Sequence, residues 1–188
     1  SIGIGAFKSN ELTSLFIPNS VTKIGDDAFN DNSSLDNIQV GKFIHSMENW
    51  RTYFEGSPIK SLEILDGVTS IRRNAFSDGD LTSIAIPDSV TEIGFRAFSE
   101  NQLTNIEIPD SVTSIGSDAF YKNKLTSIKI PDGVKTIGSG AFFENQLTSI
   151  EIPDSVISIG SSAFKSNKLT SIFIPDSVTE IGDDAFDY

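Results

Sequence analysis

Apolar residues return at the same positions every 22 residues through most of the chain. From Leu81 the unit is L-T-S-I-A-I-P-D-S-V-T-E-I-G-F-R-A-F-S-E-N-Q, and close copies begin at Leu103, Leu125, Leu147 and Leu169. A unit this short cannot bury its apolar side chains alone, so successive units must stack on one another. We therefore expect residues 1–188 to form a single elongated array of about eight coils.

Each unit is predicted to contain two short extended segments joined by turns. The L-x-x-I-x-I segment alternates apolar and polar positions, which is typical of a strand, and Pro87-Asp88 follows it as a turn. The V-T-x-I segment is a second extended piece that ends at Gly94, where we expect a positive φ. The segment at Ala97-Phe98 predicts a 3₁₀ or single helical turn. The L-x-x-I-x-I strands of adjacent units should pair in parallel, about 4.8 Å apart.

Two columns of repeated residues are predicted to hold the coils together. A phenylalanine recurs in every unit, and we expect its rings to stack in the interior: Phe29, Phe54, Phe76, Phe98, Phe120, Phe142 and Phe164. An asparagine follows three residues later and is expected to bond loop backbone groups of its own and the neighbouring coil: Asn101, Asn123, Asn145 and Asn167. Ser57 and Gly79 replace it in two units, which indicates that the asparagine is helpful rather than essential.

One irregular unit, residues 35–58, departs from the pattern. The interval from Phe29 to Phe54 is 25 residues, and the expected P-D-S-V-T-x-I-G gives way to G-K-F-I-H-S-M-E-N-W-R-T-Y-F. Its apolar residues fall at helical spacing and predict one short amphipathic helix that bulges from the convex side. The unit holds the only tryptophan, methionine and histidine of the chain.

The pattern L-T-x-I-x-I-P-x-S-V-T-x-I-G-x-x-A-F-x-x-N resembles the BspA-like, or treponemal-type, class of bacterial leucine-rich repeats. The resemblance covers essentially the whole chain and is weakest between Gly41 and Asn49. It implies an α/β repeat solenoid, a right-handed coil with a parallel β-sheet on the concave face and short strands or 3₁₀ turns on the convex face. It also implies a non-enzymatic surface or secreted protein that binds other proteins, often in adhesion.

Composition narrows the classes of function. The formal net charge of −12 argues against nucleic acid, because neutralising phosphates needs clustered Lys and Arg. The absence of cysteine excludes a disulfide framework and a thiolate metal site. We expect no cofactor, no metal and no membrane span in this segment. The chain begins and ends in mid-repeat, so we expect it to be a segment of a longer extracellular or cell-surface protein.

The variable third position of L-x-x-I-x-I is the first candidate binding surface. Against an otherwise fixed frame it holds Phe16, Gln39, Glu63, Ala85, Glu107, Lys129, Glu151 and Phe173. Variation of this kind is typical of a recognition surface, and exposed phenylalanines are typical anchors. The alternative is that solvated strand positions tolerate any residue.

The irregular unit offers a second candidate surface, in which His45, Trp50, Arg51 and Tyr53 form a contact patch. The alternative is that its aromatic residues only cover the core where a regular coil is interrupted. The expected partner for either surface is a host, matrix or cell-surface protein. We expect a monomer, with end-to-end association possible through the apolar faces of the terminal coils.

Three other hypotheses follow from the repeated columns. The array could serve only as a structural spacer that presents another domain. A column of threonines at Thr82, Thr104, Thr126, Thr148 and Thr170 could bind ice or mineral, although a curved sheet would spoil the lattice match. A column of turn aspartates could hold Ca²⁺, but local bonding of each aspartate to backbone N–H groups explains it better.

Overall fold

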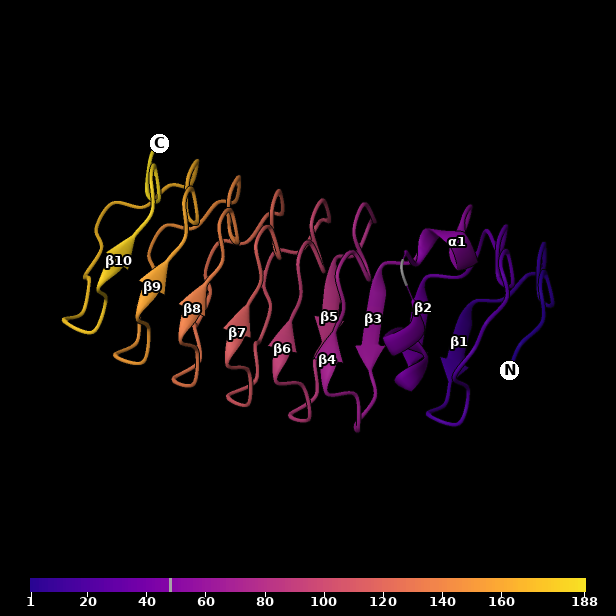
Figure 1. Cartoon of the computed structure of the whole chain (residues 1–188). Coiled ribbons are helices and arrows are strands. Elements are labelled where there is room, and N and C mark those ends of the chain that lie inside the picture. Colours follow the sequence, from indigo (N-terminus) through magenta and orange to yellow (C-terminus); the bar gives the residue numbers. More distant parts are fainter. Residues whose placement is uncertain (48) are drawn as a thin grey trace.

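The computed structural model describes residues 1–47 and 49–188 and forms a parallel-strand solenoid of about eight turns with little helix. The turns follow one another along a single axis, with the N-terminus and C-terminus at opposite ends (Figure 1). The predicted repeat solenoid is therefore confirmed. Two short sheets run along it, one from each extended segment of the repeat.

The first sheet is built from the L-x-x-I-x-I segments. It contains β1 (Ser14–Ile17), β2 (Asn37–Val40), β3 (Ser61–Ile64) and β5 (Ser83–Ala85), in the parallel order β1-β2-β3-β5. Further along the chain, pairing on this side is reduced to the isolated parallel bridges from Lys129 to Glu151 and from Glu151 to Phe173. The predicted parallel pairing thus forms a regular ladder only in the N-terminal half. We call this side the Ile-Pro face, because each segment ends at or near that dipeptide.

The second sheet is built from the V-T-x-I segments and defines the Ile-Gly face. Its six parallel strands, each two residues long, are β4 (Ser70–Ile71), β6 (Glu92–Ile93), β7 (Ser114–Ile115), β8 (Thr136–Ile137), β9 (Ser158–Ile159) and β10 (Glu180–Ile181). Their order follows the sequence without a break. This face, rather than the Ile-Pro face, therefore carries the continuous sheet of the C-terminal coils.

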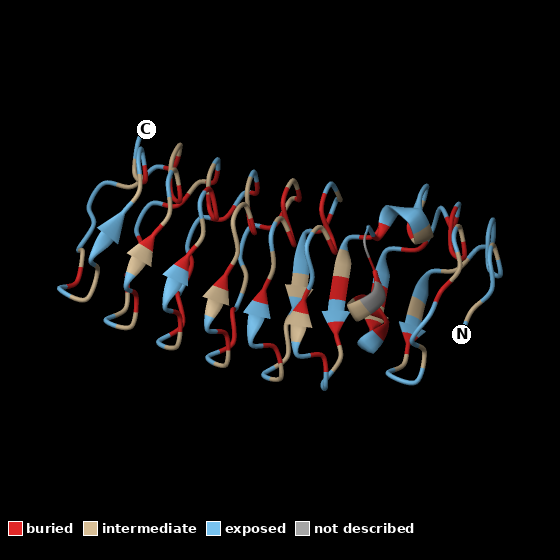
Figure 2. Cartoon of the chain, viewed as in Figure 1, coloured by how far each residue is buried: buried red, intermediate tan, exposed pale blue. Residues whose placement is uncertain are grey.

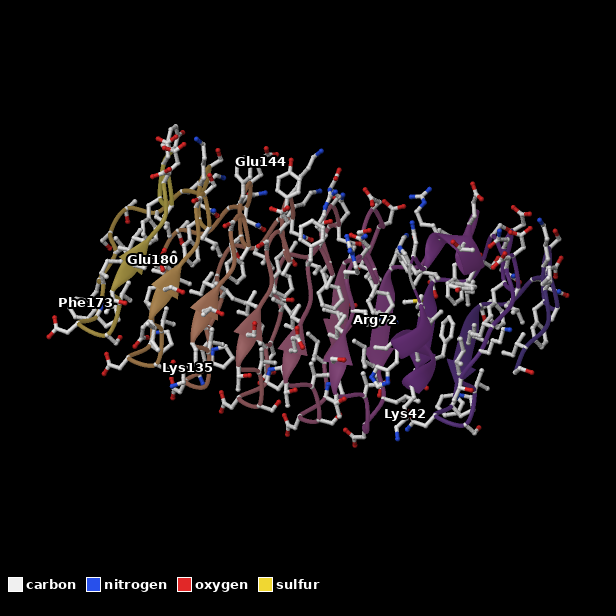
Figure 3. All side chains as sticks on the ribbon, in the orientation of Figure 1. Lys42, Arg72, Lys135, Glu144, Phe173 and Glu180 are labelled. Carbon is white, nitrogen blue, oxygen red and sulfur yellow. The ribbon has the colours of Figure 1, made fainter. Side chains whose placement is uncertain are left out.

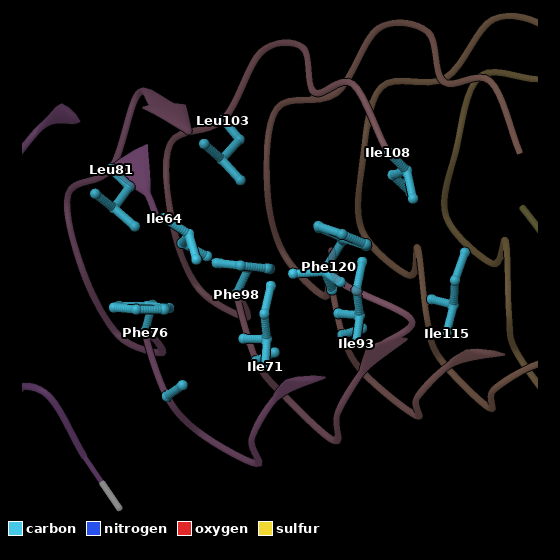
Figure 4. Packing of buried hydrophobic residues seen from close by; sticks show 14 of the residues in the cluster. Ile64, Ile71, Phe76, Leu81, Ile93, Phe98, Leu103, Ile108, Ile115 and Phe120 are labelled. Atoms are coloured by element: carbon cyan, nitrogen blue, oxygen red, sulfur yellow. The ribbon is translucent and has the colours of Figure 1, made fainter. Parts of the chain in front are cut away.

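Apolar side chains from the stacked coils meet in one continuous core between the two faces. Buried residues recur along the array (Figure 2), and Figure 4 shows the packing of residues from its central coils. The phenylalanine rings stack along it, with centroids 5.6 Å apart between Phe76 and Phe98 and 5.4 Å apart between Phe120 and Phe142. Their planes differ by 6° and 9° in these two pairs. Each coil therefore buries its largest apolar surface only against the rings of its neighbours, which accounts for the fixed period.

The asparagines bond across the joint between coils. Asn123 donates from Nδ2 to the carbonyl oxygens of Phe98 at 2.9 Å and Phe120 at 3.2 Å, and its Oδ1 accepts the amide of Leu103 at 3.1 Å. Asn145 repeats the arrangement one coil later. Each buried asparagine therefore satisfies backbone groups that no strand pairs.

The expectation that Gly94 has a positive φ is wrong, because the left-handed positions lie on either side of Ala-Phe instead. In that unit they are Arg96 (φ 52°) and Glu100 (φ 55°). A Cβ placed on Gly94 would lie 2.7 Å from the carbonyl oxygen of Ile71 in the preceding coil. The glycine is required because neighbouring backbones approach each other too closely there for any side chain.

The single helix predicted for the irregular unit is also wrong. The structure has a 3₁₀ helix, η1 (Lys42–Ser46), and one turn of α-helix, α1 (Arg51–Phe54). Met47 is extended (φ −80°, ψ 127°) and ends η1, so the chain can turn back and return Phe54 to the ring stack, 5.3 Å from Phe29. The helical spacing did mark inward-facing side chains, since Phe43, Ile44, Met47, Trp50 and Phe54 are buried. Glu48 lies outside the described residues.

The turn after each Ile-Pro segment supplies a testable detail of the joint between coils. Ser111 and Ser155 donate to the carbonyl oxygens of Val90 at 2.6 Å and Val134 at 2.7 Å, but Gly133 occupies the same place in the intervening unit. A Cβ on Gly133 would lie 3.2 Å from the carbonyl oxygen of Val112, the matching acceptor.

We expect Gly133→Ser to raise the unfolding free energy by about 1 kcal/mol, through one added hydrogen bond and a less flexible unfolded chain. Thermal unfolding of the two proteins measures the change. Gly133→Ala is the matched control, since it shares the effect on the unfolded chain and lacks the hydroxyl. A serine variant no more stable than the alanine variant would show that the hydrogen bond does not form.

Candidate functional site

The variable column forms aligned, exposed rows on the Ile-Pro face. Strand register pairs Phe16 with Gln39 and Gln39 with Glu63, and the isolated bridges pair Lys129 with Glu151 and Glu151 with Phe173. Phe16 is 58% exposed and Phe173 is 75% exposed. Figure 3 shows Phe173 projecting from the C-terminal part of the array. The coil stack therefore holds residues that are far apart in sequence next to one another in space.

Neighbouring polar side chains of this column interact with each other and with the adjoining turns. Gln39 donates from Nε2 to a carboxylate oxygen of Glu63, and Lys129 pairs with Asp110 at 3.3 Å. Glu107 lies outside the paired strands but lines the same hollow as Lys129 and Asp110. A second hollow, next to it, is lined by Lys129, Glu151 and Phe173. The Ile-Pro face is thus a shallow, mostly acidic trough with exposed aromatic residues.

The aspartates of the Pro-Asp turns border this trough. Among the residues that the structure describes, no group of three or more His, Asp or Glu side chains is placed to hold a metal ion. Asp110 is instead paired with Lys129. The Ca²⁺ hypothesis thus gains no geometric support from these aspartates.

Charged residues also gather along the Ala-Phe turns, at another edge of the coils. There Lys165 pairs with Asp187 at 2.8 Å and Asp184 at 3.0 Å, which raises the pKa of Lys165 and lowers that of Asp187. Burial raises the pKa of Asp118, and the nearby Arg96 guanidinium opposes that shift. Solvent screens charge pairs as exposed as these, so this edge adds little to stability.

The proposed contact patch of the irregular unit is not a single surface. Trp50 is only 4% exposed and donates from Nε1 to the carbonyl oxygen of Ser77 at 2.9 Å. Its ring contacts those of Phe54 and Phe76, with centroids 6.4 and 5.9 Å away, and so fills the core between two coils. We therefore correct its assignment from an exposed contact residue to a core residue.

Of the three other candidates, Tyr53 packs edge-on against the ring of Phe43 within the irregular unit, with centroids 5.2 Å apart. The remaining two, His45 and Arg51, touch different segments of the next coil. The carbonyl oxygen of His45 accepts a hydrogen bond from Arg72, beside β4, at 2.6 Å. The guanidinium of Arg51 donates to the carbonyl oxygen of Asp78, in the Ala-Phe turn, at 2.6 Å. These anchors join the irregular unit to its neighbour at two separate places.

A pocket of about 340 Å³ opens where the irregular unit meets the next coil. Trp50, Phe54, Pro58 and Ile59 supply its apolar lining. Exposed charged residues complete it: Arg51, Glu55, Asp78 and Asp80.

Sequence reasoning missed this pocket, although the signal was the loss of asparagine at Ser57 and Gly79. A Cβ on Gly79 would collide with the indole of Trp50, so only a glycine at this position leaves room for that ring. Ser57 and Gly79 therefore mark the particular packing at the pocket, and they also show that the column accepts residues other than asparagine.

The threonine column is not carried on one continuous sheet, although backbone hydrogen bonds join Thr104, Thr126 and Thr148 across adjacent coils. Thr104, Thr126 and Thr148 lie outside the described strands, and Thr82 donates its hydroxyl to the carbonyl oxygen of Lys60 at 3.2 Å. A flat lattice of hydroxyl groups needs an unbroken sheet, so the geometry does not favour ice or mineral binding.

Short parallel strands, one coil per repeat and a spine of stacked rings define a leucine-rich-repeat solenoid. The model of the BspA type leucine rich repeat region matches residues 1–122 and 69–188, so the chain belongs to that family and the resemblance is confirmed. Proteins with this repeat are typically non-enzymatic binding modules. A search of curated proteins finds no match.

Solved structures of bacterial leucine-rich repeat proteins resemble the chain. A protein from Bacteroides ovatus is 27% identical with a TM-score of 0.59, over 96% of this chain and 49% of that protein. A leucine rich cell surface protein from Faecalibacterium prausnitzii is 27% identical (TM-score 0.45, 99% and 73% covered), and a T. pallidum leucine rich repeat protein is 22% identical (TM-score 0.49, 93% and 71% covered). The chain thus spans about half the length of the B. ovatus protein. Across the described residues, no helix is long and apolar enough to cross a membrane.

Proposed function

We propose that this protein is a recognition module that binds another protein through the variable column of the Ile-Pro face. The observation that carries the proposal is the alignment of Lys129, Glu151 and Phe173 on adjacent coils, with Phe173 three-quarters exposed. Aromatic residues at the centre of an interface contribute strongly to binding, and charged neighbours set specificity. The stacked coils keep the column rigid, so docking orders few side chains.

The setting we propose is the bacterial cell surface or the secreted fraction, with adhesion to a host or matrix protein as the role. Family membership supports this setting. An acidic, cysteine-free chain with a net charge of −12 is also compatible with an exposed, self-repelling surface. A longer protein that carries this array would add its own domains to that role.

We expect Phe173→Asp to weaken capture by a binding partner by at least about tenfold, because it replaces an apolar anchor with a charge. The melting temperature should not change, since the side chain is exposed. An array of purified extracellular-matrix proteins, followed by affinity measurement on the protein captured, provides the test.

The matched control is Ile157→Asp, which also charges an exposed apolar residue (49% exposed) but lies on the Ile-Gly face. Capture should survive this change. If Phe173→Asp, Glu151→Lys and Phe16→Asp all leave capture intact, the column does not bind and the array is better explained as a spacer.

A further inference from the structure

The geometry points to a second site, separate from the variable column: the pocket beside Trp50 accepts the cationic side chain of an arginine or lysine from a basic partner. The assignment does not depend on the proposed role of the Ile-Pro face. It rests on the shape of the pocket, the charge of its lining and a guanidinium already held there by the chain itself.

The pocket exists because the repeat is broken at this point. The Trp50 indole inserts between the rings of Phe54 and Phe76, where other coils stack phenylalanine directly on phenylalanine. The indole fills the space beside Gly79 where regular coils place a buried asparagine, and the short side chain of Ser57 lines the hollow that remains next to it. The volume of about 340 Å³ is at the lower end of the range for ligand pockets and suits one inserted side chain.

The lining separates into an apolar part and an acidic part. The exposed Pro58 can pack against the methylene stem of a long side chain above a floor formed by the edges of the buried Trp50 and Ile59, while exposed carboxylates take its charged head: Glu55, Asp78 and Asp80. Lysine and arginine have this construction, with an apolar stem that buries readily and a charge that stays at the surface. Three carboxylates against one guanidinium, that of Arg51, leave the lining with a formal charge of −2.

Arg51 shows what the site can hold. Its Nη1 donates to the carbonyl oxygen of Asp78 at 2.6 Å, so a guanidinium already binds to the backbone of this edge. In that hydrogen bond Arg51 donates to the backbone carbonyl oxygen of Asp78 and not to its carboxylate, so the carboxylate remains available to another cation. A second cation therefore finds acidic groups of its own, whereas an anion would meet an excess of negative charge.

The only tryptophan of the chain lines the pocket and reports on its occupancy through fluorescence. The probe is N-acetyl-arginine amide, with N-acetyl-citrulline amide as the neutral analogue of nearly the same shape. We expect the arginine probe to bind with a Kd on the order of a millimolar, as one inserted side chain would. The citrulline probe should bind at least about fivefold more weakly.

The test variant is the double substitution Asp78→Asn and Asp80→Asn. Asparagine suits the left-handed backbone of Asp78 (φ 57°) and leaves its carbonyl contact with Arg51 in place. We expect arginine binding to fall at least about fivefold, whereas Asp132→Asn with Asp154→Asn, the same change of charge on the Ile-Pro turns, should have no effect.

Three results would overturn the assignment. These are equal binding of the citrulline and arginine probes, equal loss of binding in both double variants, and tighter binding of N-acetyl-aspartate amide than of the arginine probe. Phe173→Asp should leave arginine binding unchanged. Failure of this site and failure of the variable column are therefore seen in separate experiments.

Discussion

Gly138→Ala is expected to destabilise the array by about 3 kcal/mol, the upper range for an overpacked core, and to lower its melting temperature sharply. A Cβ on Gly138 would lie 2.5 Å from the carbonyl carbon of Gly116 in the preceding coil and closer still to the amide nitrogen of Ser117. Both are backbone atoms in the joint between coils, so no side-chain rotation relieves the contact. The coils must separate or shift, which also disturbs the hydrogen bond from Gly138 to Ile115 at 2.9 Å.

Gly133→Ala is the control for this prediction, because serine occupies the equivalent turn position in other coils and a Cβ is accommodated there. Denaturant unfolding of both variants measures the difference. A Gly138→Ala protein as stable as the Gly133→Ala protein would mean that the glycine column is not required by the close approach of the coils.

The second large effect is expected from the asparagine column, where neighbours share an acceptor. The carbonyl oxygen of Phe120 accepts from Asn123 at 3.2 Å and from Asn145 at 2.9 Å. Asn123→Ala alone leaves that oxygen one partner and removes the acceptor of the Leu103 amide, which we expect to cost about 2 kcal/mol. Removing both asparagines leaves the oxygen without either, so the double variant should lose about 1 kcal/mol more than the two single losses combined.

Asn101→Ala with Asn167→Ala is the matched double variant. Asn101 bonds the carbonyl oxygens of Phe76 and Phe98, whereas Asn167 bonds those of Phe142 and Phe164, so this pair shares no acceptor. Its losses should add. A double-mutant cycle on unfolding free energies gives both results, and additive losses for Asn123 and Asn145 would contradict the shared-acceptor account.

The sequence contains enough information to predict the stacked coils because the period is short and the apolar positions are fixed. A column of phenylalanines one period apart can be buried only against itself, and an asparagine beside it has unpaired loop backbone to bond. The parallel ladder follows from the same stacking. These features depend on residue type and spacing alone.

The glycine column shows where such reasoning ends. The regular spacing of Gly94 and its equivalents along the chain is explained equally well by a positive φ and by a close approach of two backbones. The structure decides for the close approach, because Gly94 has no positive φ and a Cβ on it would lie 2.7 Å from the carbonyl oxygen of Ile71. The left-handed positions themselves are filled by residues such as Arg96 and Glu100, which give no sequence signal for that conformation.

The irregular unit and its pocket were beyond sequence reasoning for a related reason. The pocket depends on the Trp50 indole meeting Gly79, a residue of the next coil 29 positions later. The helical spacing around Trp50 identified buried side chains but not the extended residue, Met47, at which η1 ends. The missing asparagines at Ser57 and Gly79 mark where the period is broken, but not which side chain fills the gap.

The central claim is that the repeated columns hold the scaffold while the variable column of the Ile-Pro face binds the partner. A saturation scan of the displayed protein, scored separately for folded display and for capture of the partner found on the matrix array, tests it directly. We predict that changes at Lys129, Glu151 and Phe173 abolish capture at normal display, whereas Ile157 and Glu180 of the Ile-Gly face tolerate change in both. Two results would contradict the account. One is that capture is lost only in variants that also lose folded display, and the other is that changes on the two faces reduce capture equally.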